Sequence, residues 1–257
     1  MDIMAFHSDY ETTRGQAAAA FDAGLRAYML RVYNWMALAL GITGVTAYAV
    51  VHTSLRALFF HVVQRGDAFA LAPTGLGMVS VFAPLAFVMV LSFGVNRLSR
   101  STVQLLFVLF SVAMGVSMAS LLLAYTGSSV VRTFFIAASL YGVMSLWGYV
   151  TNRSLMGMGS FLTMGLIGLV IASLVNMFIP AHGLTVAISF IGVLLFTGLT
   201  AYDTQRIKLS YQQYASVLPA EETGKMGIYD ALTMYLNFVN LFQFLLQFTG
   251  TRSGGRD

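Results

Sequence analysis

Charged side chains divide this chain into long apolar stretches, and the lengths of those stretches predict how it folds. Six windows contain no Asp, Glu, Lys or Arg, and each is long enough to cross a bilayer, which takes about 20 helical residues. They are residues 32–55, 68–96, 101–131, 133–152, 154–202 and 231–251. The fifth window is 49 residues long and contains Pro180 followed by Gly183, a combination that stops a helix, so it holds two helices.

Trimmed to the thickness of a bilayer, these windows predict seven membrane-spanning helices. Helices are the expected element because irregular backbone in lipid leaves its N–H and C=O groups without partners. The predicted ranges are 29–52, 74–96, 103–126, 131–151, 157–179, 184–205 and 228–249. The fold class that follows is an all-α integral membrane protein, a bundle of seven transmembrane helices.

The last of these helices carries a polar stripe along one side. Between Asp230 and Arg252 lie 21 residues without a charge, and the polar ones recur at steps of three or four. Such steps keep them on one helical face, while Leu and Phe cover the rest. The stripe consists of Thr233, Asn237, Asn240, Gln243 and Gln247. Because lipid does not tolerate such a stripe, we expect this helix to lie inside the bundle and to line a polar path.

Composition agrees with a membrane protein and narrows its chemistry. Of the 257 residues, 58% are hydrophobic and 9% are charged, against roughly a quarter charged in soluble domains. The net charge of +4 is spread singly between apolar runs, so no basic patch indicates nucleic-acid binding. The chain has no cysteine and its four histidines are scattered, so we expect no disulfide, no thiolate chemistry, no metal site and no cofactor.

The arrangement of charges predicts the domain organisation and the orientation. Residues 1–28 carry several acids and no apolar core long enough for a signal peptide, so we expect a cytoplasmic N-terminal segment there. The seven-helix domain then covers residues 29–250, and a short tail covers 251–257. With the N-terminus inside, the inner segments hold nine Lys and Arg residues and the outer segments hold five. The positive-inside rule therefore favours a cytoplasmic N-terminus and a C-terminus across the membrane.

Three polar groups are expected to meet where their helices reach the cytoplasmic face, a region called here the inner rim. Arg97 follows the second predicted helix, Asp203 stands near the end of the sixth, and Asn237 lies about 10 Å beyond Asp230 in the seventh. Asp203 is either an interfacial residue solvated beside Arg206, as terminal charges usually are, or the partner of Arg97 across the bundle. Spacing alone leaves both interpretations open.

Three segments of the chain carry a distinctive combination of polar and apolar residues. They are GLTAYDTQRIK at 198–208, ALTMYLNFVNLF at 231–242 and SLWGYVTNRSLMGMGSFLTMGLIGLVIASLVN at 145–176. Together they resemble the transmembrane Bax inhibitor motif family, and its YccA-like bacterial branch in particular, over roughly residues 27–250. The resemblance implies a seven-helix bundle whose last helix is central and surrounded by the other six. It also implies a location in a bacterial inner membrane.

The resemblance further implies a function and a set of residues. Members of the family are described as pH-sensitive calcium leak channels that sense protons through a pair of aspartates on the sixth and seventh helices. An arginine at the end of the second helix latches onto the sixth-helix aspartate. The matching residues here are Asp203 for that aspartate and Arg97 for the arginine, whereas the seventh-helix position is Asn237, which cannot titrate. Asp230, seven residues earlier on the same face, either replaces the lost carboxylate or is a helix-start acid favoured by the helix dipole.

These residues predict a channel with altered gating. We expect a cation leak channel that transports Ca²⁺, and not an enzyme. Divalent binding should be weakened by the missing carboxylate, because Ca²⁺ favours several charged oxygens. In a closed state Arg97 and Asp203 are expected to form a salt bridge, with Asn237 nearby as a hydrogen-bonding substitute. Acid sensitivity should then be blunted, and Asn237→Asp should restore it.

Two other functions are left open by the sequence. Bacterial relatives of the YccA type are associated with a membrane-bound ATP-dependent protease, so the resemblance also allows an interaction protein that modulates this protease through residues 1–28. The second is an intramembrane aspartyl protease, suggested by the pairs Tyr202-Asp203 and Tyr229-Asp230. Such an enzyme needs two carboxylates that share a proton, and the expected Gly-x-Gly-Asp is absent. The lipid bilayer is the other partner expected.

Overall fold

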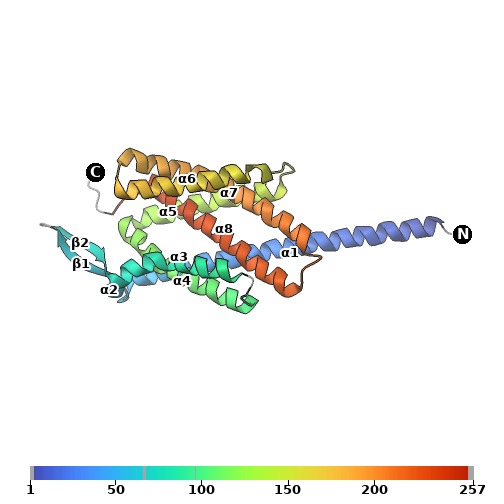
Figure 1. Cartoon of the computed structure of the whole chain (residues 1–257), viewed down its shortest axis with the longest axis horizontal. Helices are drawn as coiled ribbons and strands as arrows, with labels where there is room; N and C mark the ends of the chain where they lie inside the picture. Colours follow the sequence, from blue (N-terminus) through green and yellow to red (C-terminus); the bar gives the residue numbers. More distant parts are fainter. Residues whose placement is uncertain (1–2, 66–67, 96, 254–257) are drawn as a thin grey trace.

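The computed structural model describes residues 3–65, 68–95 and 97–253, and this part of the chain is dominated by long helices (Figure 1). Seven stretches of helix are long and apolar enough to cross a membrane, which confirms the predicted number. The helices that contain them are α1 (Ile3–His52), α3 (Gly75–Gly94), α4 (Arg100–Ala124), α5 (Gly127–Val150), α6 (Gly159–Phe178), α7 (His182–Tyr214) and α8 (Ala220–Thr249). The predicted break around Pro180 is confirmed, because α6 ends at Phe178 and α7 begins at His182.

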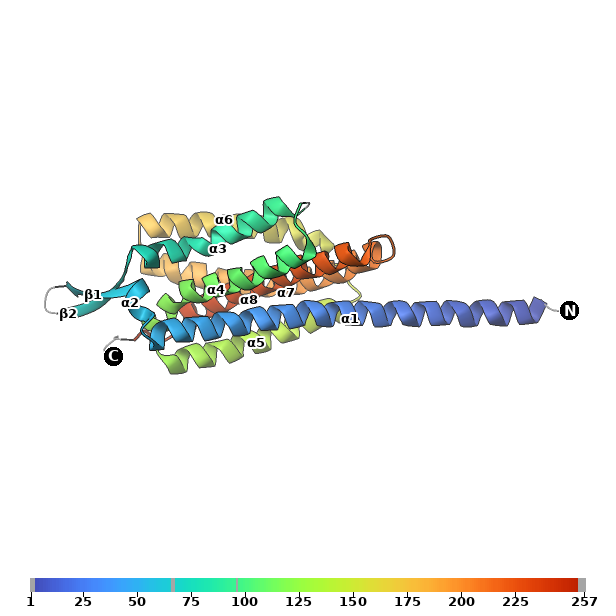
Figure 2. The same ribbon diagram turned by 90° about the horizontal axis from the view of Figure 1, so that it is seen from below.

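The helices run up and down between two ends of one bundle. The N-terminus lies beyond one end and the C-terminus lies at the other, as seven crossings require (Figure 1). The end of α7 and the start of α8 lie at the end toward which the N-terminal part of α1 projects (Figures 1 and 2). This N-terminal end of the bundle is therefore the one that holds the residues of the predicted inner rim.

Three helices extend eight or more residues beyond the predicted membrane spans. Helix α1 runs without a break from Ile3 to His52, whereas the predicted span begins at residue 29. Helix α7 continues nine residues past the predicted end at 205, and α8 begins eight residues before the predicted start at 228. A charge ends an apolar window but does not end a helix, because Arg and Lys are good helix formers. The division of the chain at residue 28 stays a prediction, since the backbone shows no boundary there.

The segment between α1 and α3 contains structure that the sequence did not predict. It holds the short helix α2 (Arg56–Phe59) and an antiparallel hairpin of β1 (Phe60–Arg65) and β2 (Ala68–Pro73), in which Phe60 pairs with Pro73. Thr74 then caps α3, because its hydroxyl accepts a hydrogen bond from the Gly77 amide at 3.1 Å. Figure 2 shows the hairpin at the same end of the bundle as the C-terminus.

The C-terminal tail is tied to the turn between α4 and α5. The Thr126 amide donates to the Thr251 carbonyl at 3.0 Å, and the Ser253 amide donates to the Ala124 carbonyl at 2.9 Å. The Thr251 amide donates in turn to the Ser129 hydroxyl at 3.0 Å. The bond from Ser253 gives a partner to the Ala124 carbonyl at the end of α4, a group that a helix terminus otherwise leaves unsatisfied.

Helix α8 is the most buried of the seven. Of its most apolar stretch 61% is buried, against 44% for α7 and 11% for the span that includes α6. It packs against α1, α4, α5 and α7, and its side chains Met234, Tyr235 and Leu241 are completely buried. Burial on several sides is what the polar stripe requires, since a polar face exposed to lipid is costly.

Helices α5 and α7 approach each other closely at Gly148. A Cβ atom added to Gly148 would lie 2.9 Å from the Ala201 Cα, which is nearer than side-chain carbons approach a backbone. Ala201 is itself buried, two residues before Asp203. Small residues at such crossings let membrane helices pack backbone against backbone. This contact fixes where the end of α7 lies relative to α5.

Candidate functional site

The carboxylate of Asp203 is buried between α7 and α8, and both of its oxygens have partners. Its Oδ2 atom accepts a hydrogen bond from Asn237 Nδ2 of α8 at 2.7 Å. Its Oδ1 atom lies 2.9 Å from an Arg206 guanidinium nitrogen, one turn further along α7. Asp203 is 6% exposed and Asn237 is also 6% exposed, so water has little access to the pair. The carboxylate is thus held by one neutral donor from the adjacent helix and one cation from its own helix.

The ion pair spans the boundary between the bundle interior and its surroundings. The Asp203 side chain is 8% exposed and that of Arg206 is 41% exposed. Arginine commonly lays its aliphatic stem along an apolar surface and keeps its charged group in contact with water. A buried carboxylate needs such a cation, because isolated charge in a low-dielectric interior is strongly unfavourable. Arg206 supplies the compensating charge while its own side chain stays partly exposed to water.

Arg97 lies elsewhere in this conformation. It follows α3, its side chain is exposed, and among the described residues it takes part in no salt bridge. The cation paired with Asp203 is Arg206. This is the pairing expected if Asp203 is an interfacial residue beside Arg206. The salt bridge between Arg97 and Asp203 was predicted for a closed state, and it stays a prediction.

Asp230 occupies a second position near the same end of α8. Its Oδ2 atom accepts a short hydrogen bond, 2.5 Å long, from the Tyr28 hydroxyl of α1. Asp203 of α7 and Asp230 of α8 are thus two separate carboxylates on neighbouring helices. They have separate hydrogen-bond partners, and an aspartyl protease requires two that share a proton. The arrangement therefore does not favour the protease interpretation.

The polar stripe of α8 faces α7 at two of its five positions. Asn237 donates a hydrogen bond to Asp203 of α7. Ten residues further along α8, the Gln247 side-chain oxygen accepts a hydrogen bond from the Ser189 hydroxyl of α7 at 3.4 Å. Thr233 is half-buried and donates to the Tyr229 carbonyl of its own helix at 3.1 Å. Asn240 and Gln243 are half-buried as well, whereas Gln247 is exposed. The stripe thus lies in and beside the contact between α7 and α8.

Hydroxyl groups connect the neighbourhood of Asp203 to other helices, and these links were not predicted from the sequence. Tyr33 of α1 hydrogen-bonds to Ser145 of α5, and Ser145 lies 3.0 Å from the Thr204 hydroxyl of α7. Thr204 is the residue after Asp203. Isolated Ser, Thr and Tyr residues are common in membrane helices, so only knowledge of which helix faces meet could have singled these out.

The loop between α5 and α6 is fixed to α7 by the residues that follow Thr204. The buried Gln205 side chain accepts from the Leu155 amide at 2.6 Å and donates to the Arg153 carbonyl at 2.9 Å. Lys208 donates to the Tyr149 carbonyl at 2.8 Å. The part of α7 around Asp203 is therefore hydrogen-bonded to α8 through Asn237 and to the α5–α6 loop through Gln205.

The chemistry available at this end of the bundle is proton and cation exchange. Among the residues that the structure describes, no three His, Cys, Asp or Glu side chains gather as a metal site. Asp203 and Asp230 are the half-buried or buried acids, and each can take up or release a proton and can attract a cation. Intramembrane acids of this kind typically mark ion pathways or proton relays.

Comparison with known proteins decides the family. The family model described as "Inhibitor of apoptosis-promoting Bax1" matches residues 25–254, almost the whole chain. The chain belongs to the Bax inhibitor family. This confirms the resemblance found in the three sequence segments. The match also includes both Asp203 and Asn237, so the geometry described above lies within the family's own domain.

Several bacterial proteins are similar to this chain over nearly their full length. An uncharacterized protein of Rickettsia prowazekii is 46% identical over 233 residues, which cover 90% of this chain and 92% of that protein. An uncharacterized protein of Caulobacter vibrioides is 44% identical over 240 residues, 91% of this chain and 92% of that protein. The inner membrane protein YbhL of Escherichia coli is 40% identical over 231 residues, 90% of this chain and 94% of that protein.

Proposed function

We propose that this member of the Bax inhibitor family is a cation leak channel of a bacterial inner membrane, that it passes Ca²⁺, and that protonation modulates it. The observation that carries the proposal is the buried Asp203 carboxylate, which joins α7 to α8 through Asn237 and is neutralised by Arg206. A buried charge held between two helices is a group whose protonation changes how those helices pack. The inner-membrane location is supported by the name of the similar E. coli protein.

The proposed path follows the polar stripe of α8. Ions would pass beside Thr233, Asn237, Asn240, Gln243 and Gln247, and Asp203 would close the path at the N-terminal end of the bundle. While Asp203 is ionised, its bonds to Asn237 and Arg206 hold α7 against α8. Uptake of a proton removes the attraction to Arg206 and weakens the charge-assisted bond from Asn237. With the ion pair lost and the bond from Asn237 weakened, the end of α7 would separate from α8 more readily.

Calcium flux into liposomes tests the proposal. We expect the purified wild-type protein to admit Ca²⁺, with a modest difference between pH 6 and pH 8 because one carboxylate does the sensing. Asn237→Asp should steepen the pH dependence, since two adjacent carboxylates titrate as a coupled pair. Asp203→Asn should remove the pH dependence that remains. The flux is measured with an indicator dye inside the liposomes.

The matched control for Asp203→Asn is Asp22→Asn. Asp22 is an exposed acid on α1, near the same end of the bundle, so its removal changes net charge equally without touching the buried pair. A pH response that Asp203→Asn leaves unchanged, or that Asp22→Asn abolishes, would show that Asp203 is not the sensor. Absence of flux at both pH values for the wild type would contradict conduction itself.

A second candidate function rests on the projecting part of α1. Figure 2 shows this helix continuing well beyond the bundle. A helical extension of this kind suits an interaction protein that modulates a membrane-bound ATP-dependent protease. Co-purification from native membranes distinguishes the functions: deleting residues 1–20 should abolish a protease complex and leave calcium flux intact. Flux that is lost with the deletion would assign the extension to the channel instead.

The orientation of the chain is a further prediction. We expect the N-terminus in the cytoplasm and the C-terminus on the opposite side, from the nine inner and five outer basic residues. A reporter that is active only in the cytoplasm, fused after Asp257, should therefore be inactive, and the same reporter before Met1 should be active. The reverse pattern would place Asp203 at the outer face and would remove it from cytoplasmic pH control.

A further inference from the structure

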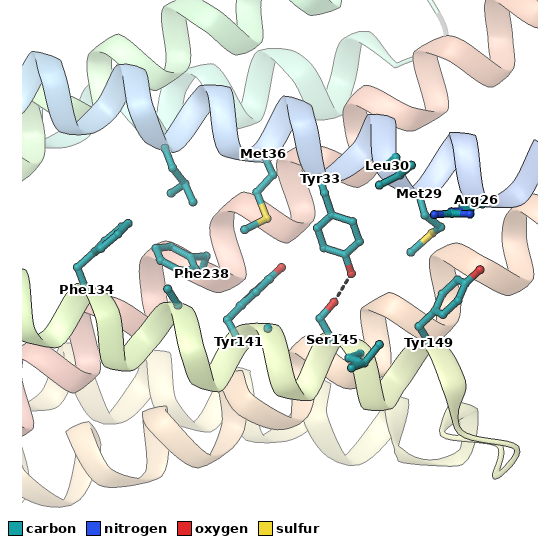
Figure 3. A pocket seen from close by; sticks show the side chains of 14 residues that line it. Arg26, Met29, Leu30, Tyr33, Met36, Phe134, Tyr141, Ser145, Tyr149 and Phe238 are labelled. Carbon is teal, nitrogen blue, oxygen red and sulfur yellow. Dashed lines mark hydrogen bonds between the residues drawn. The ribbon is translucent and has the colours of Figure 1, made fainter.

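A long apolar groove lies between α1 and α5. Its volume is about 550 Å³, and Figure 3 shows its walls: Met29 and Met36 come from α1, Tyr141 from α5, and Phe238 of α8 lies behind them. The hydroxyls of Tyr33 and Ser145 meet across its floor. Both wall helices are membrane spans, so the groove opens toward lipid. Pockets of this size are typical of sites for small molecules.

The length of the groove matches one leaflet of a bilayer. Its α1 wall runs from Arg26 to Leu40, and the fourteen steps between these residues rise about 21 Å at 1.5 Å each. Half of a bilayer, with its headgroup region, is about 20–22 Å thick. A second apolar hollow of about 360 Å³ continues from Leu40, Phe134 and Phe238 toward the other end of the bundle. The first groove therefore covers the depth of the leaflet at the N-terminal end.

A positive charge stands at the mouth of the groove. Arg26 is exposed, and it is the charged residue in the lining. Figure 3 shows Arg26 on one wall and Tyr149 on the other, at the same end. The Lys208 ammonium lies 5.1 Å from the centre of the Tyr149 ring, so a second cation stands behind that wall. An anionic group at the headgroup level would face this end.

We propose that the groove between α1 and α5 binds one anionic phospholipid, with an acyl chain along its apolar walls and the phosphate at Arg26. Charge complementarity at the mouth and the one-leaflet length select this occupant. The binding does not depend on whether the chain conducts ions.

The bound lipid would lie against the hydroxyls that lead to the candidate site. Tyr33 and Ser145 form the floor of the groove, and Ser145 is 3.0 Å from Thr204, the neighbour of Asp203. An acyl chain in contact with Tyr33 keeps water away from this row of hydroxyls. The lipid would thereby prevent water in the groove from reaching Asp203 along the hydroxyls of Tyr33, Ser145 and Thr204.

Competition between two lipids tests the headgroup part of the proposal. The protein is reconstituted in nanodiscs that contain equal amounts of phosphatidylglycerol and phosphatidylcholine, and the lipid retained after release is identified by native mass spectrometry. We expect one retained lipid, mostly phosphatidylglycerol. Arg26→Gln should lower the preference about fivefold, the effect of one cation near a membrane surface. Arg31→Gln is the matched control, because this exposed residue lines a different crevice of the same helix, beside Gly224 and Gly227.

A filled groove tests the acyl-chain part. A Cβ added to Gly142, which lines the groove, meets no atom within 4 Å, so Gly142→Leu is expected to place its side chain in the open space of the groove. Retention of both lipids should fall severalfold. Gly168→Leu is the control, since Gly168 of α6 also has open space around it and lies outside the groove. Equal retention in the two leucine variants, or equal lipid preference in the two glutamine variants, would overturn the proposal.

Discussion

Gly148→Ala is expected to destabilise the bundle strongly, although it adds only one methyl group. The new Cβ would lie 2.9 Å from the Ala201 Cα, so α5 and α7 would have to move apart. The contacted atoms belong to the Ala201 backbone, which cannot relieve the clash by changing rotamer as a side chain can. Overpacking of a well-packed contact typically costs about 1–3 kcal/mol, and we expect the upper end of that range here. Thermal unfolding in detergent measures the loss.

The same substitution at Gly142 provides the control. Gly142 lies on the same helix, less than two turns away, and a Cβ there meets no atom within 4 Å. Alanine is the better helix former by about 0.5–1 kcal/mol, so Gly142→Ala should be neutral or slightly stabilising. The two substitutions should therefore have opposite signs. Equal midpoints of unfolding would contradict the close approach of α5 and α7.

The consequences of Gly148→Ala should extend to the candidate site. Ala201 precedes Asp203 by two residues, and the Gln205 side chain fixes the same part of α7 to the α5–α6 loop. A shift of α7 away from α5 would alter the position of Asp203 relative to Asn237. The pH dependence of calcium flux should therefore change in this variant, and not in Gly142→Ala.

The sequence predicted the seven spans because lipid imposes a simple rule on it. Each span must be apolar for about 20 residues, and the charges between spans are therefore visible in the sequence. The ends of α7 and α8 were predicted too short for the same reason. Asp203 and Asp230 end the apolar windows at residues 202 and 231, but the helices continue through them.

The hairpin between α1 and α3 could not be derived in this way. Residues 60–73 lie outside the spans, where neither lipid nor a strict alternation of polar and apolar residues constrains the chain. Val62 and Val63 are adjacent β-branched residues, but a pair of this kind is too short a signal to assign a strand. The prediction of an all-α membrane bundle therefore holds for the spans, with this small sheet outside them.

The candidate site was predictable in its depth but not in its pairings. Counting residues along a helix shows how far Asp203 and Asn237 lie from a helix end, and the stripe shows that Asn237 must be buried. The rotation of α7 against α8, which brings the two side chains to 2.7 Å, is set by packing. The hydroxyls of Tyr28, Tyr33 and Ser145 join the site for the same reason, and no spacing in the sequence connects them.

The choice between Arg206 and Arg97 as the partner of Asp203 gives the second expected result of large effect. In the structure Arg206 holds the carboxylate at 2.9 Å, so Arg206→Gln should leave a buried charge without its cation. Because the Arg206 side chain is 41% exposed, solvent screening limits the loss, and we expect about 1–2 kcal/mol at pH 8. At a pH low enough to protonate Asp203 the loss should shrink, since a neutral acid needs no cation. Arg97→Gln should change stability little at either pH.

A double-mutant cycle assigns the partner directly. Stability is measured at pH 8 for Asp203→Asn, for each arginine variant and for each double variant, and the non-additive part is the coupling energy. The coupling between Asp203 and Arg206 should be about 1 kcal/mol, and that between Asp203 and Arg97 should lie within about 0.5 kcal/mol of zero. The opposite result would mean that the protein rests with Arg97 latched onto Asp203, the closed state predicted from the sequence. Arg206 would then be a surface residue, and control by Asp203 would pass through α3 instead of through α7 alone.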